Sequence, residues 1–245
     1  TANTTGSQNT AVGANALDSN TTAANNTAVG YNAGNGLTTG TANVAVGTAA
    51  LVSSTTSSNN TAVGYAALNA NTAAANCTAV GKSALIANID GENMVAVGAD
   101  ALAANTTGSN SVAIGASALA AQTTANANLA IGKSAGAANT SGTENVFIGH
   151  EAGNDVTTGA GHTLIGFKAG DKITTASQNT AVGDEALGAN TGGGLNTAVG
   201  YNAMLGNTTG GDCTAVGARA LDAANAADGN TAVGSAALGA NTTGA

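Results

Sequence analysis

The stretch Asn110–Gly115, which reads N-S-V-A-I-G, is the clearest copy of a unit that recurs along the whole chain. The glycine of this unit returns at every seventeenth position, fourteen times between Gly13 and Gly234, without one insertion. Such a fixed period predicts a repeat architecture, in which each unit buries its apolar side chains against its neighbours. Positions in the repeat are counted here from this glycine, which is position 0.

The residues before the glycine predict a short strand. Position −1 is Val or Ile in every copy, position −2 is Ala in twelve, and position −3 is Thr, Val or Leu. Apolar β-branched residues at alternate positions indicate a strand with one face inward, and a glycine ends it. The residues expected inside the coil are Val12, Val29, Val63, Val112, Ile114, Ile131, Ile148, Ile165, Leu68, Leu102, Ala118 and Ala135, and the turn is expected at Gly13, Gly115 and Gly234.

Positions +3 and +4, which follow the glycine, indicate tight packing. Position +3 is Ala in every copy, and position +4 is Leu in nine copies and Gly in four. In three of those four copies an apolar residue takes the place of the usual Asn at position +7, so we expect the two positions to fill the same buried volume. The pairs are Gly34 with Leu37, Gly153 with Val156, and Gly170 with Ile173.

A repeat of this length is too short for paired helices but suits one coil of a solenoid. The sequence predicts an all-β fold, a parallel β-solenoid of about fourteen coils, each with two short strands and two turns. Turn chemistry recurs in A-N-T-T-G, as at Ala104–Gly108, and the chain contains no proline that would interrupt strand pairing. We expect residues 1–245 to form a single domain, as a window of a longer chain or filament.

Composition excludes several partners. The net charge is −8, with only five Lys and Arg residues, whereas nucleic acids and anionic membranes select basic surfaces. No apolar run approaches the roughly 20 residues that a membrane-spanning helix needs. We therefore expect no nucleic acid partner and no membrane insertion in this segment.

The motif resembles the head repeats of trimeric autotransporter adhesins, the YadA-like or Hep/Hag-type β-roll. The resemblance rests on Asn110–Gly115, on the related Asn145–Gly149 and on the N-T-A-V-G copies, and it covers essentially the whole chain. The longer variant at Asn60–Ala74 and Asn196–Gly210 also looks like repeats in tail-fibre and surface proteins of marine viruses and bacteria. The resemblance implies a left-handed β-roll, a homotrimer and an extracellular attachment role, with Val112 and Ile114 pointing into the coil.

Candidate chemistry is sparse. His150, Glu151, Asp155 and His162 form the densest group of metal-ligand types, but His150 lies in a variable, solvent-facing position and His162 replaces a turn Asn. We interpret the group as solvated surface and expect no metal, no cofactor and no catalytic residues. The sequence lacks a nucleophile elbow and a phosphate-binding loop, so we expect a protein that is not an enzyme.

The two cysteines, Cys77 and Cys213, both lie at position −4, eight repeats apart. Coils that rise about 4.8 Å would separate them by roughly 38 Å, too far for a disulfide within the chain. We interpret them as small fillers of an Asn position; a bond between chains is the alternative.

The leading functional hypothesis is a structural protein: the rigid shaft of an extracellular, cell-surface or virion-surface fibre that self-associates as a homotrimer or filament and serves attachment. One alternative is ice binding, since position +8 is Thr in twelve copies. Another is an adhesin head that binds a host-surface glycan or protein. Its candidate aromatic residues are Tyr31, Tyr65, Phe167 and Tyr201.

Overall fold

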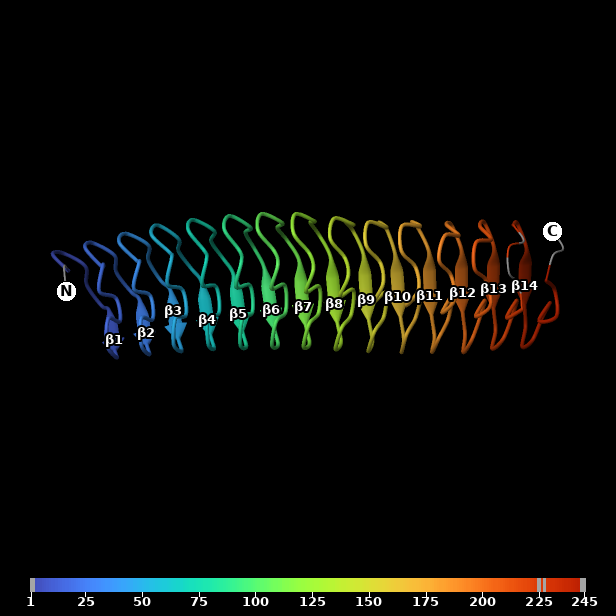
Figure 1. Ribbon diagram of the computed structural model, residues 1–245, viewed down its shortest axis with the longest axis horizontal. Coiled ribbons are helices and arrows are strands. Elements are labelled where there is room, and N and C mark those ends of the chain that lie inside the picture. Colours follow the sequence, from blue (N-terminus) through green and yellow to red (C-terminus); the bar gives the residue numbers. More distant parts are fainter. Residues whose placement is uncertain (1–2, 224–225, 227, 243–245) are drawn as a thin grey trace. The chain divides into compact units, whose positions relative to one another are not determined.

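The computed structural model describes residues 3–223, 226 and 228–242, and it confirms a parallel β-solenoid. The chain divides into two compact units, Thr1–Ala125 and Asn126–Ala245. Within each unit successive strands pair in parallel, and each residue lies opposite its equivalent in the next repeat, as Ala62 does opposite Ala79 (Figure 1). The first unit holds β1 (Thr10–Val12), β2 (Thr27–Val29), β3 (Val44–Val46), β4 (Thr61–Val63), β5 (Thr78–Val80), β6 (Val95–Val97) and β7 (Val112–Ile114). The second unit holds β8 (Leu129–Ile131), β9 (Val146–Ile148), β10 (Thr163–Ile165), β11 (Thr180–Val182), β12 (Thr197–Val199), β13 (Thr214–Val216) and β14 (Thr231–Val233).

The prediction of two strands per coil is wrong, because each described repeat contains one strand of three residues. After the strand the backbone alternates into the left-handed region, with φ of 58° at Ser117 and 50° at Leu119. Left-handed residues break the extended conformation that a second strand requires. The rest of the coil consists instead of stacked turns, and Leu102 N still donates to Ala118 O of the next repeat at 3.0 Å.

The core of each unit is a narrow column of small residues and leucines. Position −2 from the strand and positions +3 and +4 from the following turns point inward, so that Ala113, Ala118 and Leu119 have no exposed surface. The burial expected for Leu68, Leu102, Ala118 and Ala135 is confirmed, since each is fully buried.

The predicted core Val and Ile residues at positions −3 and −1 do not belong to this core, and the prediction that they do is wrong. Val12 is 57% exposed and Ile114 is 39% exposed. Strand side chains alternate between faces, so once the Ala at −2 points inward, positions −3 and −1 must point outward. The residues corrected from core to outward-facing are Val12, Val29, Val63, Val112, Ile114, Ile131, Ile148 and Ile165.

The glycine at position 0 forms the predicted turn. Gly13, Gly115 and Gly234 have φ of 128°, 136° and 128°, a conformation that residues with a Cβ rarely adopt. The coils also approach closely there: a Cβ on Gly200 would lie 2.6 Å from the carbonyl oxygen of Gly217. Both the conformation and the space therefore require glycine.

The predicted compensation of volume between positions +4 and +7 is confirmed for Gly34 with Leu37 and for Gly170 with Ile173. A Cβ on Gly34 would lie 3.1 Å from Leu37 Cδ1, and one on Gly170 would lie 2.8 Å from Ile173 Cδ1. Beside Gly153 the nearest side chain is the ring of Phe147, not the predicted Val156. Position +4 accepts either Leu or Gly because its backbone is left-handed, where Gly adopts the conformation without strain.

Candidate interaction face

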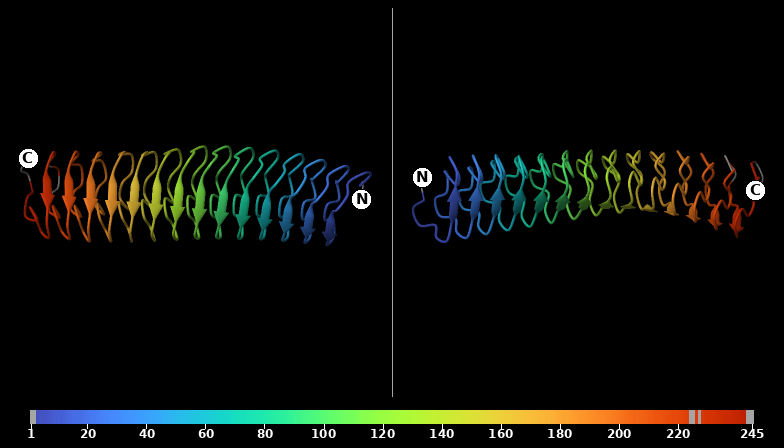
Figure 2. Two further views of the ribbon diagram at one scale, coloured as in Figure 1. Left: turned by 180° about the vertical axis from the view of Figure 1, so that it is seen from behind. Right: turned by 90° about the horizontal axis from the view of Figure 1, so that it is seen from below.

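The strands of each unit present an outward surface built from one recurring pair of side chains. We call the residues at positions −3 and −1 of the strands in each unit, β1–β7 in the first and β8–β14 in the second, the outward strand face of that unit. In each unit the strands lie on one side of the coils and the loops on the other (Figure 2). Every residue of the face is half-buried or exposed, while the residue between the pair is buried in β2–β14.

The outward strand face is uncharged and mostly aliphatic. Position −1 is Val or Ile in all fourteen strands, and position −3 is Thr, Val or Leu. Single exposed aliphatic residues are normal on protein surfaces, but a continuous exposed row of them marks an interaction site. Sequence reasoning assigned this row to the core and so missed the surface.

Position −3 divides the face into two kinds of strand. In β3, β6, β7, β8 and β9 this residue is aliphatic, so the whole outward pair is apolar. In the remaining strands it is threonine: Thr10, Thr27, Thr61, Thr78, Thr163, Thr180, Thr197, Thr214 and Thr231. In β10–β14 the threonines occupy five successive strands.

A buried asparagine at position −4 fixes the start of most strands. Asn145 Nδ2 donates to Gly159 O at 3.0 Å, and Asn145 Oδ1 accepts from His162 N at 2.9 Å. The backbone N of Asn145 in turn donates to Asn128 Oδ1 at 2.9 Å. The amide thus satisfies backbone groups of the following repeat inside the coil, where unpaired groups would be costly.

His162 performs the same task with an imidazole ring. Its Nε2 lies 2.8 Å from Ala176 O and its Nδ1 lies 3.2 Å from Asn179 N. Because Nδ1 must accept from that N–H, the proton belongs on Nε2 and the ring is neutral. Burial lowers the pKa of His162, against the opposing effect of the hydrogen bonds to Ala176 and Asn179. The interpretation of His162 as a replacement for Asn is confirmed, but its interpretation as solvated surface is wrong, because the ring is buried.

Cys77 and Cys213 fill the same position as free, buried thiols. Cys77 Sγ donates to Gly91 O at 3.3 Å, in the place of an asparagine amide. Burial raises the pKa of the Cys77 thiol, with a weaker contribution from Glu92. The interpretation of both cysteines as fillers of an Asn position agrees with these contacts.

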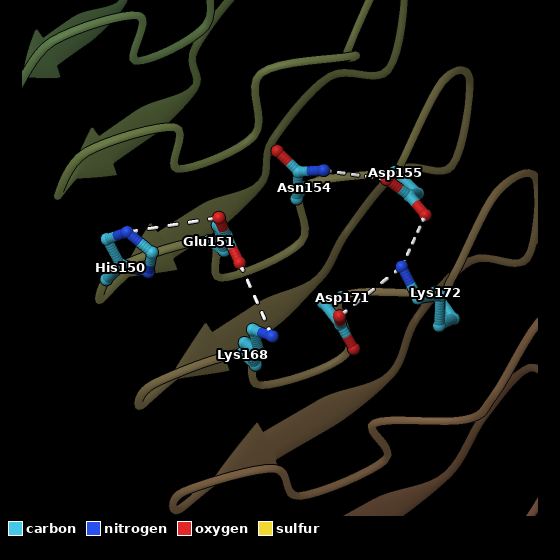
Figure 3. Close-up of polar contacts among 7 residues, drawn as sticks. All are labelled: His150, Glu151, Asn154, Asp155, Lys168, Asp171 and Lys172. Atoms are coloured by element: carbon cyan, nitrogen blue, oxygen red, sulfur yellow. Dashed lines mark hydrogen bonds and ion pairs between the residues drawn. The ribbon is translucent and has the colours of Figure 1, made fainter.

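Several charged residues of the second unit form ion pairs between adjacent repeats (Figure 3). Lys168 Nζ lies 3.7 Å from Glu151 Oε2, and His150 Nε2 lies 3.9 Å from Glu151 Oε1. His150 also stacks on Phe167, with ring centroids 5.7 Å apart. Lys168 Nζ lies 5.4 Å from the centroid of the Phe167 ring. The ring of Phe167 thus contacts both His150 and Lys168.

A second group of ion pairs lies beside the first. Lys172 Nζ lies 3.0 Å from Asp155 Oδ2 and 3.5 Å from Asp171 Oδ2, and Asn154 Nδ2 donates to Asp155 Oδ1 at 2.7 Å (Figure 3). Its hydrogen bond to Asp155 raises the pKa of Lys172, and desolvation raises the pKa of Asp171 although Lys172 opposes it. Asp171 is largely buried, whereas Lys172 and Asp155 are open to solvent, and a solvent-exposed ion pair of this kind has small energetic value.

The structure separates the residues considered as metal ligands. His150, Glu151 and Asp155 lie on the surface, whereas His162 is buried in the asparagine column. Among the described residues, no group of three His, Cys, Asp or Glu side chains is arranged to hold a metal ion.

The threonines at position +8 are committed to the fold. Thr106 Oγ1 donates to Thr123 O at 3.1 Å, and Thr191 Oγ1 donates to Thr208 O at 3.1 Å. The same bond recurs between other successive repeats, so these hydroxyls link coil to coil. This contact explains why position +8 is almost always Thr. These hydroxyls bond within the protein, so they no longer support the ice-binding hypothesis drawn from the sequence.

Of the aromatic residues considered for glycan binding, Tyr31, Tyr65 and Tyr201 are each more than half exposed. All three lie at position +1, and Tyr31 and Tyr65 are two repeats apart. No shared aromatic platform for a sugar follows from this placement.

Comparisons with protein families, with characterised proteins and with solved structures give no significant match to this chain. In the described part of the chain, no helix has the length and apolar character to cross a membrane.

Proposed function

We propose that this protein is a non-enzymatic structural segment of an extracellular, cell-surface or virion-surface fibre, and that it assembles with further copies of itself through the outward strand face. The observation that carries the proposal is the row of Val and Ile at position −1 of each unit, half-buried or exposed in every strand. A solenoid with stacked identical coils provides the stiff support that a fibre needs.

A second copy of the chain is the partner that suits this face best. It presents the same rows at the same spacing, so side chains of one copy fit between those of the other along every repeat. The chain carries a net charge of −8, yet no charged residue lies in either outward row. Packing the faces together therefore buries apolar surface without burying charge.

The oligomeric mass tests the proposal. We expect light scattering to give a multiple of 22.8 kDa for the full chain, three copies being the expected multiple. Replacing two outward isoleucines, Ile114→Lys with Ile131→Lys, should reduce the mass to that of one chain, because each copy would then bury charges against its partner.

The matched control places the same charges away from the face, as Thr107→Lys with Thr124→Lys. Both threonines are exposed and lie on the loop side of the coils. This control should retain the parent mass. A full chain that remains a monomer at every concentration, with native circular dichroism, would contradict assembly through this face.

A further inference from the structure

In strands β10–β14 the outward strand face presents an unbroken row of threonines at position −3. Going beyond the structural role, we propose that this surface binds ice. Its residues at position −3 are Thr163, Thr180, Thr197, Thr214 and Thr231, and its residues at position −1 are Ile165, Val182, Val199, Val216 and Val233.

The first argument is the geometry of the array. The strands pair in register, so that each threonine lies opposite the next, as Thr180 does opposite Thr197. Parallel strands repeat about every 4.8 Å, and two side chains on one face of a strand are about 6.6 Å apart. These repeats resemble the oxygen spacings on the prism faces of hexagonal ice, so one array of side chains meets successive water positions.

The second argument is the hydrogen-bonding state of the hydroxyls. Within the described residues, none of these five hydroxyls makes a hydrogen bond to the protein, whereas the hydroxyls at position +8, such as that of Thr191, donate to the next coil. The outward hydroxyls are therefore free to bond to water. The methyl groups beside them exclude competing water arrangements.

The third argument is rigidity. Thr, Val and Ile are β-branched and stiff about χ1, so the array loses little side-chain entropy when it meets a solid surface. Beneath them Ala181, Ala198 and Ala215 are fully buried and hold the strands in place. No charged side chain, which would bind disordered water strongly, interrupts either row.

Ice growth tests this inference. The chain that carries Ile114→Lys and Ile131→Lys, in which no second copy covers the face, should produce thermal hysteresis and inhibit ice recrystallisation, and the threonine variants are made in this background. Thr180→Lys with Thr197→Lys should reduce that activity at least tenfold with an unchanged circular dichroism spectrum, and Thr180→Val with Thr197→Val should reduce it less. Thr175→Lys with Thr209→Lys, two exposed threonines at position +9, is the matched control and should keep full activity.

Self-assembly and ice binding are separated by this background. Ile114→Lys with Ile131→Lys leaves β10–β14 intact and is expected to release single chains, whose ice-binding surface is then uncovered. Ice activity of that variant supports the inference whatever the oligomeric state of the parent. Absence of hysteresis and of recrystallisation inhibition from this variant, or full activity in the Thr180→Lys, Thr197→Lys chain, would overturn it.

Discussion

Single residues in this solenoid are constrained chiefly by backbone conformation. Many non-glycine residues have positive φ, among them leucines such as Leu68 at 49° and Leu102 at 52°. A left-handed conformation costs an ordinary residue on the order of 1 kcal/mol. Leu68 and Leu102 accept this cost because the same turn places their side chains in the core, where both are fully buried.

The glycine at position 0 is less tolerant, because space is lacking as well as conformational freedom. Gly200→Ala should lower the free energy of unfolding by about 3 kcal/mol or more, since φ is 137° and the new Cβ would lie 2.6 Å from Gly217 C. Gly192→Ala is the control, because its Cβ would meet nothing nearer than Thr209 Cγ2 at 3.9 Å. Chemical unfolding of both variants checks this; equal effects would contradict it.

His162 should make the stability of the second unit depend on pH. The folded state holds the ring neutral and lowers its pKa below the ordinary value of 6.5. As the pH falls from 6.5 to the folded pKa, the unfolded state binds the extra proton, so the free energy of unfolding falls by up to about 1.4 kcal/mol per pH unit. His162→Asn should remove this component from unfolding curves recorded between pH 7.5 and 5; an unchanged pH dependence would argue against it.

At the scale of the element, most of the three-residue strands depend on the asparagine at position −4 that precedes them. Asn196 Nδ2 donates to Gly210 O at 2.8 Å, and Asn196 Oδ1 accepts from Cys213 N at 3.0 Å. A strand this short has few ladder hydrogen bonds of its own. The amide column therefore supplies a large part of the directional contacts at the strand start.

Removing one amide should be costly. Asn196→Ala leaves the backbone N of Cys213 without its acceptor inside the coil, and we expect a loss of about 2–4 kcal/mol in the free energy of unfolding. Asn196→His should lose less, because His162 already bonds the equivalent groups with its ring. Thermal unfolding compares the two, and a histidine variant as unstable as the alanine variant would refute the equivalence.

The periodic spacing predicted the parallel solenoid, the glycine turns and the buried +3 and +4 positions. It did not predict the direction of the strand faces, because hydrophobicity alone assigns Val and Ile to the core. Side-chain packing instead places position −2 in the core. Phe147 and Leu164, the large residues at position −2, occur in repeats whose position +4 is glycine, and a Cβ on Gly170 would lie 2.9 Å from Leu164 Cδ1. That pairing in the sequence was a signal that position −2 faces inward.

The prediction of a second strand in each coil was wrong for a related reason. Ala and Leu after the glycine indicate burial, but no local pattern shows that positions +2 and +4 adopt positive φ. Each left-handed conformation is imposed by the coils on either side, as where Leu102 N bonds Ala118 O.

At the scale of the whole chain, every repeat has the same length, and successive strands pair in the same register. Deleting Thr61–Cys77, one full period, joins Asn60 to Thr78 and restores the register between β3 and β5. We expect a folded chain with an unchanged spectrum per residue and a slightly lower unfolding temperature, because one set of contacts between coils is lost.

Deleting Thr61–Asn69, about half a period, should instead abolish cooperative unfolding. It would place outward residues at inward positions in the coil that bridges the cut. Circular dichroism and thermal unfolding distinguish the two deletions, and comparable stability for both would contradict the coil-by-coil account.

The buried amides at position +7 have a consequence for how the protein is produced. Asn105 Nδ2 donates to Gly108 O at 3.0 Å and Asn207 Nδ2 donates to Gly210 O at 2.9 Å, while each Asn begins an Asn-Thr-Thr sequence that eukaryotic secretory cells recognise for attachment of sugar chains. An oligosaccharide joined to either nitrogen before the coil closes has no room inside it. Modification and folding therefore compete at these sites, and hosts without this machinery are expected to give the more homogeneous protein.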